Sequence, residues 1–223
     1  RYYGRLNYGV PQSEASVLVR FRFESTAANP LTDFGITLGH DANNTMYSLA
    51  IQANWNEIAI QVYDHGYRYE LTRKAFGLQK SVDYWARFRT TAAGVYGRIW
   101  QAGTVEPSAW TISSIHWNGG NTVGAGTAGF VVNSTRDAYT VHLDTYFFYT
   151  DDEINSGAYP TDTFDNRQVI WGWGQSSSGH IWEGAVNHDP EYFNYTHYSQ
   201  VASGLGYIQP IDTQRYYAIL GGT

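Results

Sequence analysis

The sequence predicts an all-β fold, an antiparallel β-sandwich, from three observations. Apolar and polar residues alternate with a period of two through most of the chain, and no stretch shows a helical period. Turn-forming residues separate the alternating runs. Aromatic residues make up 17% of the chain and favour strands. Many short strands at close spacing are typical of a sandwich or a barrel.

The first expected strand is ASVLVRFRFE, residues 15–24. One face carries four apolar residues, Val17, Val19, Phe21 and Phe23. The other carries one leucine and two arginines, Leu18, Arg20 and Arg22. One apolar and one mixed face fit a sheet that is covered on one side.

The same period continues along the chain, broken by turn-forming strings such as HDANN (40–44), DHG (64–66) and NGGN (118–121). Further strands are expected at 33–40, 46–53, 56–64, 67–71, 84–91, 96–103, 109–114, 128–133 and 139–149.

The composition changes after Thr150. Residues 151–160 are acidic and small and end in proline, so they are interpreted as a linker. Strand-like runs then resume at 167–174, 179–184, 198–204 and 216–220.

The chain opens with RYYGRL (1–6) and nearly closes with RYYAIL (215–220). Four of the six positions match. This is either chance in a tyrosine-rich chain or the sign of a structural unit 214 residues long. The second interpretation predicts that residues 1–150 are a sandwich lacking its leading strands, and that residues 161–223 are the leading strands of a second copy. Those strands would fold back on the same chain or complete a neighbour, and we favour the neighbour because head-to-tail strand donation builds a fibre.

Five strings together resemble the concanavalin A-like, laminin-G-like sandwich modules in minor tail proteins of phages that infect Actinobacteria. The strings are DTF (162–164), GWG (172–174), GHIW (179–182), the Arg-rich pair YWARFRTTAAGVYGRIWQAGTVEPSAW (84–110) and HLDTYFF (142–148). In those modules the first three precede the others, whereas here they follow them. The resemblance therefore implies a jelly roll that is cut or permuted relative to the usual order.

Composition excludes several partners. The net charge is −6, which argues against nucleic acid, and no apolar run approaches the roughly 20 residues of a membrane helix. There is no cysteine, so disulfides and thiolate metal sites are excluded. Without a visible signal peptide or an initiator Met, the sequence is expected to be a processed chain or a piece of a longer one.

No catalytic residue is predicted. Glycoside hydrolases need a pair of carboxylates across a cleft, and the string Glu-x-Asp-x-x-Glu that enzymes on this scaffold use does not occur. Polysaccharide lyases of this fold carry Arg-rich and Gln-x-His strands. Arg20 and Arg22 alternate here, but the Gln-x-His string is missing. The seven histidines form no zinc-binding pair.

The resemblance implies one possible cofactor, Ca²⁺, near the junction of the opening and closing strands. Asp144 matches the closing strand and Asp162 the opening one, and carboxylate oxygens suit this ion. The alternative is that Asp144 is an exposed strand residue.

Sugar rings stack on exposed aromatic side chains, although a Trp in a sandwich is more often part of the core. The candidates near loops or on alternate strand faces are Trp55, Tyr63, Tyr67, Trp100 and Trp117.

These observations predict a non-enzymatic structural or carbohydrate-binding module of an extracellular assembly, in first place a phage tail component that contacts host surface polysaccharide. Its expected partners are that polysaccharide and copies of itself, at the virion tail or on a cell surface. The first alternative is a purely structural subunit of a fibre built by head-to-tail strand donation. The second is a carbohydrate-active enzyme module.

Overall fold

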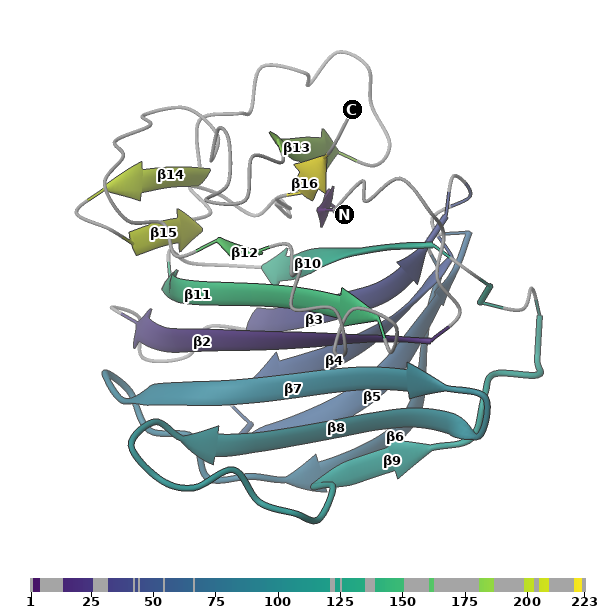
Figure 1. The fold of residues 1–223 in the computed structure, drawn as a ribbon, viewed down its shortest axis with the longest axis horizontal. Helices are drawn as coiled ribbons and strands as arrows, with labels where there is room; N and C mark the ends of the chain where they lie inside the picture. Colours follow the sequence, from purple (N-terminus) through teal and green to yellow (C-terminus); the bar gives the residue numbers. More distant parts are fainter. Residues whose placement is uncertain are drawn as a thin grey trace.

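The structure, a computed structural model, consists of strands and loops and confirms the predicted all-β fold. It describes residues 2–4, 14–25, 32–41, 43, 45–53, 55–65, 67–120, 123–124, 126–134, 139–150, 161–162, 181–186, 199–202, 205–208 and 219–221. The strands form two sheets that face each other (Figure 1). Within each sheet, every pair of hydrogen-bonded strands is antiparallel.

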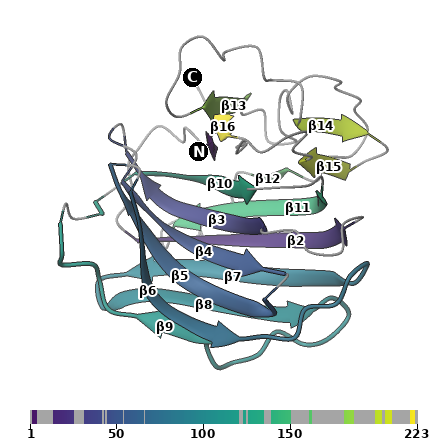
Figure 2. The same cartoon turned by 180° about the vertical axis from the view of Figure 1, so that it is seen from behind.

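The first sheet has eight strands, and hydrogen-bonded pairing links them in the order β16-β13-β1-β10-β3-β4-β5-β6. Its curved surface faces the viewer in Figure 2. Its strands are β1 (Tyr2–Gly4), β3 (Thr32–His40), β4 (Met46–Gln52), β5 (Glu57–Asp64), β6 (Tyr67–Ala75), β10 (Thr127–Ser134), β13 (Ile181–Val186) and β16 (Ile219–Gly221).

The second sheet also has eight strands, in the order β14-β15-β11-β2-β7-β8-β9, with β12 paired to β11. Its long strands run across the front of the molecule in Figure 1. Its strands are β2 (Ala15–Ser25), β7 (Asp83–Thr91), β8 (Gly94–Gln101), β9 (Ile112–Ser114), β11 (Tyr139–Thr150), β12 (Thr161–Asp162), β14 (Ser199–Ala202) and β15 (Leu205–Ile208).

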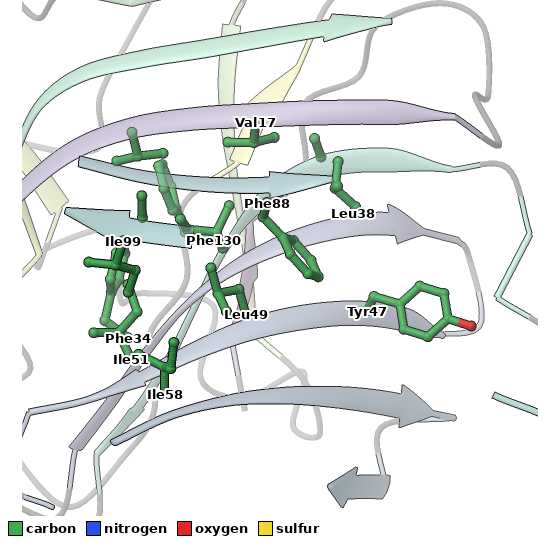
Figure 3. Packing of buried hydrophobic residues seen from close by; sticks show 14 of the residues in the cluster. Val17, Phe34, Leu38, Tyr47, Leu49, Ile51, Ile58, Phe88, Ile99 and Phe130 are labelled. Carbon is green, nitrogen blue, oxygen red and sulfur yellow. The ribbon is translucent and has the colours of Figure 1, made fainter. Parts of the chain in front are cut away.

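The core lies between the sheets, as the alternating pattern predicts. Val17, Val19 and Phe21 of β2 point inward and are almost fully buried. Phe34 of β3 packs against Phe21 with ring centroids 5.6 Å apart and against Phe130 of β10 at 5.4 Å. Figure 3 shows Phe34 and Phe130 in this layer, together with Val17. Aromatic pairs at such separations contribute beyond the area that they bury.

Gly97 shows how closely the sheets approach each other. A Cβ atom added at Gly97 of β8 would lie 2.7 Å from Cδ1 of Leu49, which belongs to β4 in the opposite sheet. Leu49 lies at the centre of the packed layer in Figure 3. Any side chain at position 97 would therefore displace Leu49 from its place in the core.

The sequence predicts sheets that are covered on one face only, and the first sheet differs from this prediction at its centre. β7 alternates between buried and half-buried residues, as expected, but every residue of β4 is buried. Ser48 and its cross-strand neighbour Gln61 of β5, which lie on the face away from the core, are among the buried residues. The first sheet is therefore shielded on both faces at its centre.

Two of the strands have bounds that differ clearly from the predicted ones. The strand expected at 109–114 is reduced to β9, and the strand expected at 67–71 continues to Ala75. β15 was not expected from the sequence, because LGYI is too short to establish a period. The strand expected at 167–174 lies outside the described residues.

The C-terminal part of the chain pairs with the N-terminal part of the same chain. β13 pairs with β1 in the first sheet, and β12 and β15 pair with β11 in the second. This is the fold-back arrangement of the expected leading strands, within one chain. Donation of the same strands to a neighbouring chain stays a prediction.

The loop that replaces the expected strand at 109–111 crosses the outer face of the second sheet. Glu106 in this loop accepts two hydrogen bonds from Arg87 of β7, at 2.6 and 2.9 Å. It also lies 3.3 Å from Nε of Arg98 on β8, whose guanidinium stacks over the ring of Trp110 at 3.8 Å. Burial lowers the pKa of Arg98, and the Glu106 carboxylate opposes this shift. The Arg-rich strand pair therefore clamps the loop to the sheet.

Replacing Glu106 with alanine is expected to lower the free energy of unfolding by about 1–3 kcal/mol, because two half-buried guanidinium groups lose their charged partner. The measurement is denaturant unfolding. The matched control is Glu70→Ala, which breaks the bidentate pair with the exposed Arg73 on β6. A surface pair contributes about 0–1 kcal/mol. Equal effects from the two variants would contradict the clamp.

Candidate functional site

Three aromatic side chains gather where β5 turns into β6. Tyr67 and Tyr69 are two residues apart on β6, so they share a face, and their side chains are 71% and 43% exposed. The ring of Tyr69 stacks on Trp117, with centroids 4.9 Å apart and planes 27° apart. We name Tyr67, Tyr69 and Trp117 the aromatic platform.

Hydrogen bonds with Tyr47 and His116 hold the backbone of Trp117 in position. Its backbone N–H donates to the hydroxyl of Tyr47 on β4 at 2.9 Å, and that hydroxyl lies 3.1 Å from Nδ1 of His116. Nε2 of His116 lies 2.7 Å from the carbonyl oxygen of Thr91, which can only accept, so this nitrogen carries the proton. In the neutral ring Nδ1 then accepts from Tyr47. Burial raises the pKa of Tyr47, which keeps the hydroxyl protonated for this role.

A carboxylate lies beside the platform. Asp64 ends β5 opposite Tyr67, and its Oδ1 is 2.8 Å from Nδ1 of His65. Gly120 passes so close to Asp64 that a Cβ atom there would collide with Oδ2. The same Cβ would lie 3.2 Å from Nε1 of Trp117, a buried donor with no partner among the described residues. The loop therefore brings the carboxylate and the indole N–H close to the same glycine.

This arrangement can bind a flat ligand with an apolar face and polar edges. The exposed rings of Tyr67 and Tyr69 and the partly buried ring of Trp117 provide apolar faces with a polar tip. The Asp64 side chain, 14% exposed, provides carboxylate acceptors for hydroxyl groups at the edge. A platform of this kind is suited to stacking against a sugar ring.

The predicted stacking residues fall into two groups. Tyr67 and Trp117 come together in the platform. Tyr63 is fully buried, and Trp100 is buried against Trp85 at 6.5 Å, so neither offers a free face. Trp55 is half-exposed, but it lies at the turn between β4 and β5, the opposite end of β5 from the platform.

Tyr69 and Asp64 were not among the predicted site residues. A signal for Tyr69 was present, since Tyr67 and Tyr69 alternate on one strand and must share a face. Asp64 had no such signal, because its proximity to Trp117 depends on a loop that begins far along the chain.

The carboxylates on the outer face of the second sheet are paired with arginines. Arg20 of β2 donates to Asp83 at 2.6 Å and to Asp144 of β11 at 3.0 Å. The hydrogen bond with Asp83 raises the pKa of Arg20, although burial opposes this shift. Arg22 lies 3.0 Å from Nδ1 of His142.

The calcium hypothesis concerns the same region. β12 pairs its Asp162 with Tyr146, two residues along β11 from Asp144, so the backbones of both predicted ligands are close. Asp144 nevertheless has Arg20 as its cationic partner, and no group of three or more His, Asp or Glu side chains occurs within the described part of the chain. The side chain of Asp162 is outside that part. The described side chains therefore do not form a calcium site.

The calcium site stays a prediction, and removal of the ion tests it. If Ca²⁺ binds only the native state, excess EDTA should lower the thermal midpoint by several degrees, and added Ca²⁺ should restore it. Asp144→Asn should abolish that response. A midpoint that EDTA leaves unchanged would remove calcium from consideration.

Comparison with known proteins gives fold neighbours only. No protein-family model and no curated protein sequence matches the chain. Among solved structures, it is similar to the carbohydrate-binding module CBM66 from Bacillus subtilis, with 9% identity and a TM-score of 0.43 over 55% of this chain and 68% of that one. It is also similar to sheep galectin-11, with 6% identity and a TM-score of 0.46 over 66% of this chain and 98% of that one. A homodimeric agglutinin from chicken liver has 17% identity and a TM-score of 0.39 over 59% of this chain and 89% of that one.

Within the described residues, no helix is long and apolar enough to cross a membrane.

Proposed function

We propose that this chain is a non-enzymatic carbohydrate-binding β-sandwich module of an extracellular assembly. The aromatic platform is the observation that carries the proposal. Tyr67 and Tyr69 expose their rings side by side, Trp117 stacks behind Tyr69, and Asp64 lies at the edge. Large exposed aromatic side chains next to a hydrogen-bonding group are typical of ligand sites rather than of ordinary surface.

The assembly that we propose is a phage tail that contacts host surface polysaccharide, and the support for it is the sequence resemblance given above. The non-enzymatic part of the proposal is supported by the ion pairs that engage Asp83, Asp144 and Glu106 with arginines. A purely structural fibre subunit is the alternative, and it would have no use for a platform that is open to solvent.

Tyr67→Ala and Tyr69→Ala are each expected to weaken polysaccharide binding at least tenfold, since each removes an exposed stacking ring. Binding is followed by tryptophan fluorescence, because Trp117 reports from within the platform. The ligand panel is β-glucan, chitin oligomers, arabinogalactan and alginate. Trp55→Ala is the matched control, since this exposed aromatic residue lies at the opposite end of β5.

The outcomes separate the three functions. Binding that both tyrosine variants lose and the Trp55 variant keeps supports the module. No binding of any saccharide leaves the structural subunit as the better interpretation. Release of reducing ends from the panel, abolished by replacing a single Asp or Glu, would establish the enzyme.

A further inference from the structure

The two RYY strings of the chain meet at one strand. β1 belongs to the N-terminal string and β16 to the C-terminal one, and both pair antiparallel with β13. β1 pairs with Gly184–Val186, whereas β16 pairs with Ile181–Glu183, so the pairing partners do not overlap. Figure 1 shows the three strands together, at the end of the molecule where both termini lie.

The two strings also take the same register on β13. Tyr2 pairs with Val186 and Gly4 with Gly184. Ile219 pairs with Glu183 and Gly221 with Ile181. Shifted by the 214 residues that separate the two strings, Ile219 corresponds to position 5 and Gly221 to position 7. β16 therefore continues the register of β1, as though one strand ran from position 2 to position 7.

Hydrogen-bonded pairing links β16 to β13 and β13 to β1, but it does not fix the edge of β13 on which β16 lies. The contacts of β16 place it on the same edge as β1. β1 pairs with β10 on its other side, and β16 contacts both β10 and β1. Strands in a sheet are spaced by about 4.8 Å, so a strand beyond the far edge of β13 would lie about 14 Å from β10. We name the space between β10 and β13 the shared lane. Half of it is occupied by one string and half by the other.

A single continuous string would fit the shared lane better than two halves. β1 pairs with β10 only at Tyr2 and Tyr3, and among the described strands β16 pairs with β13 alone. One uninterrupted strand could form ladders with both neighbours over all six positions, which would satisfy more backbone groups.

We propose that the shared lane is a docking site for the C-terminal RYYAIL string of a second copy of this chain. Each chain carries two strings that fit one lane, so a lane that one whole string fills leaves the other string of that chain without a place in it. Entry of a partner's string displaces the resident β1 and replaces its contacts with equivalent ones. Exchange of this kind costs little and extends head to tail, because the accepting chain keeps its own C-terminal string.

Proline variants of the intact chain test the exchange. Tyr3→Pro removes a backbone N–H from the N-terminal string, and Leu220→Pro removes one from the C-terminal string. Tyr3→Ala and Leu220→Ala keep the N–H and control for loss of the side chains. Sedimentation velocity over a wide concentration range measures self-association. Tyr3→Pro is expected to strengthen it at least tenfold, because its lane stands open, and Leu220→Pro to weaken it at least tenfold, because its donor string is lost.

A labelled peptide covering residues 214–221 probes the lane directly. It should bind the double variant Tyr3→Pro/Leu220→Pro at least tenfold more tightly than the wild-type chain, and the same peptide with proline at the Leu220 position should not bind. If the double variant does not unfold cooperatively, Leu220→Pro alone takes its place. A folded variant that ignores the peptide overturns the proposal. A Tyr3→Pro chain that stays monomeric throughout also overturns it, since its lane is then filled by its own C-terminal string.

Discussion

Replacing Phe34 with alanine should lower the free energy of unfolding by about 3–5 kcal/mol, which is the range for large aromatic truncations in a packed core. Phe34 is fully buried, and its ring contacts Phe21 and Phe23 of β2 and Phe130 of β10. Its removal leaves a cavity that the surrounding strands can close only in part, because both sheets are held by their hydrogen-bonded ladders. Denaturant unfolding followed by tryptophan fluorescence measures the change.

Two further variants serve as controls for the Phe34→Ala measurement. Phe34→Leu keeps most of the apolar volume and should cost clearly less than Phe34→Ala. Trp55→Ala removes an exposed ring from a turn and should change stability by about 0.5 kcal/mol or less. If Phe34→Ala cost no more than Trp55→Ala, the aromatic cluster would not be the centre of the core.

Ending the chain after residue 160 should leave an aggregation-prone fragment. The truncation removes β12 and β15, which pair with β11, and β13, which pairs with β1. Each sheet then gains an open edge, and unpaired strand edges recruit other chains. Size-exclusion chromatography and dye binding to exposed apolar surface are the measurements.

A shorter truncation provides the control for the deletion. Ending the chain after residue 218 removes only β16, and the N-terminal string can then extend along the shared lane, so this chain should stay soluble. A fragment ending at residue 160 that is soluble and unfolds cooperatively would contradict both versions of the leading-strand hypothesis, fold-back and donation alike.

The strands of residues 15–101 were predictable because each carries its own period. Val17, Val19 and Phe21 alternate with residues of a mixed face, and the structure buries all three on one face. Where the local pattern was short or mixed, prediction failed. Residues 109–111 have strand-like letters, but Glu106 and Trp110 attach this loop to Arg87 and Arg98 instead.

The candidate site was predictable only in part. Tyr67 and Trp117 could be chosen as aromatic residues near loops, but so could Tyr63 and Trp100, which proved to be buried. On a sandwich strand, the same aromatic residue can face the core, a neighbouring loop or solvent. Sequence alone does not distinguish these positions when both faces of a sheet are covered, as they are at β4.

By itself, the sequence determined the fold class, most strand positions and the matching strings at the two ends, because these depend on local periodicity and identity. Only the tertiary structure decided which aromatic residues form the platform, and that the two strings share one register on β13. The physical reason is the same for both. Contacts between residues far apart in the chain depend on how strands are ordered and aligned in the sheets, and that order is set by packing of the whole core rather than by any one segment.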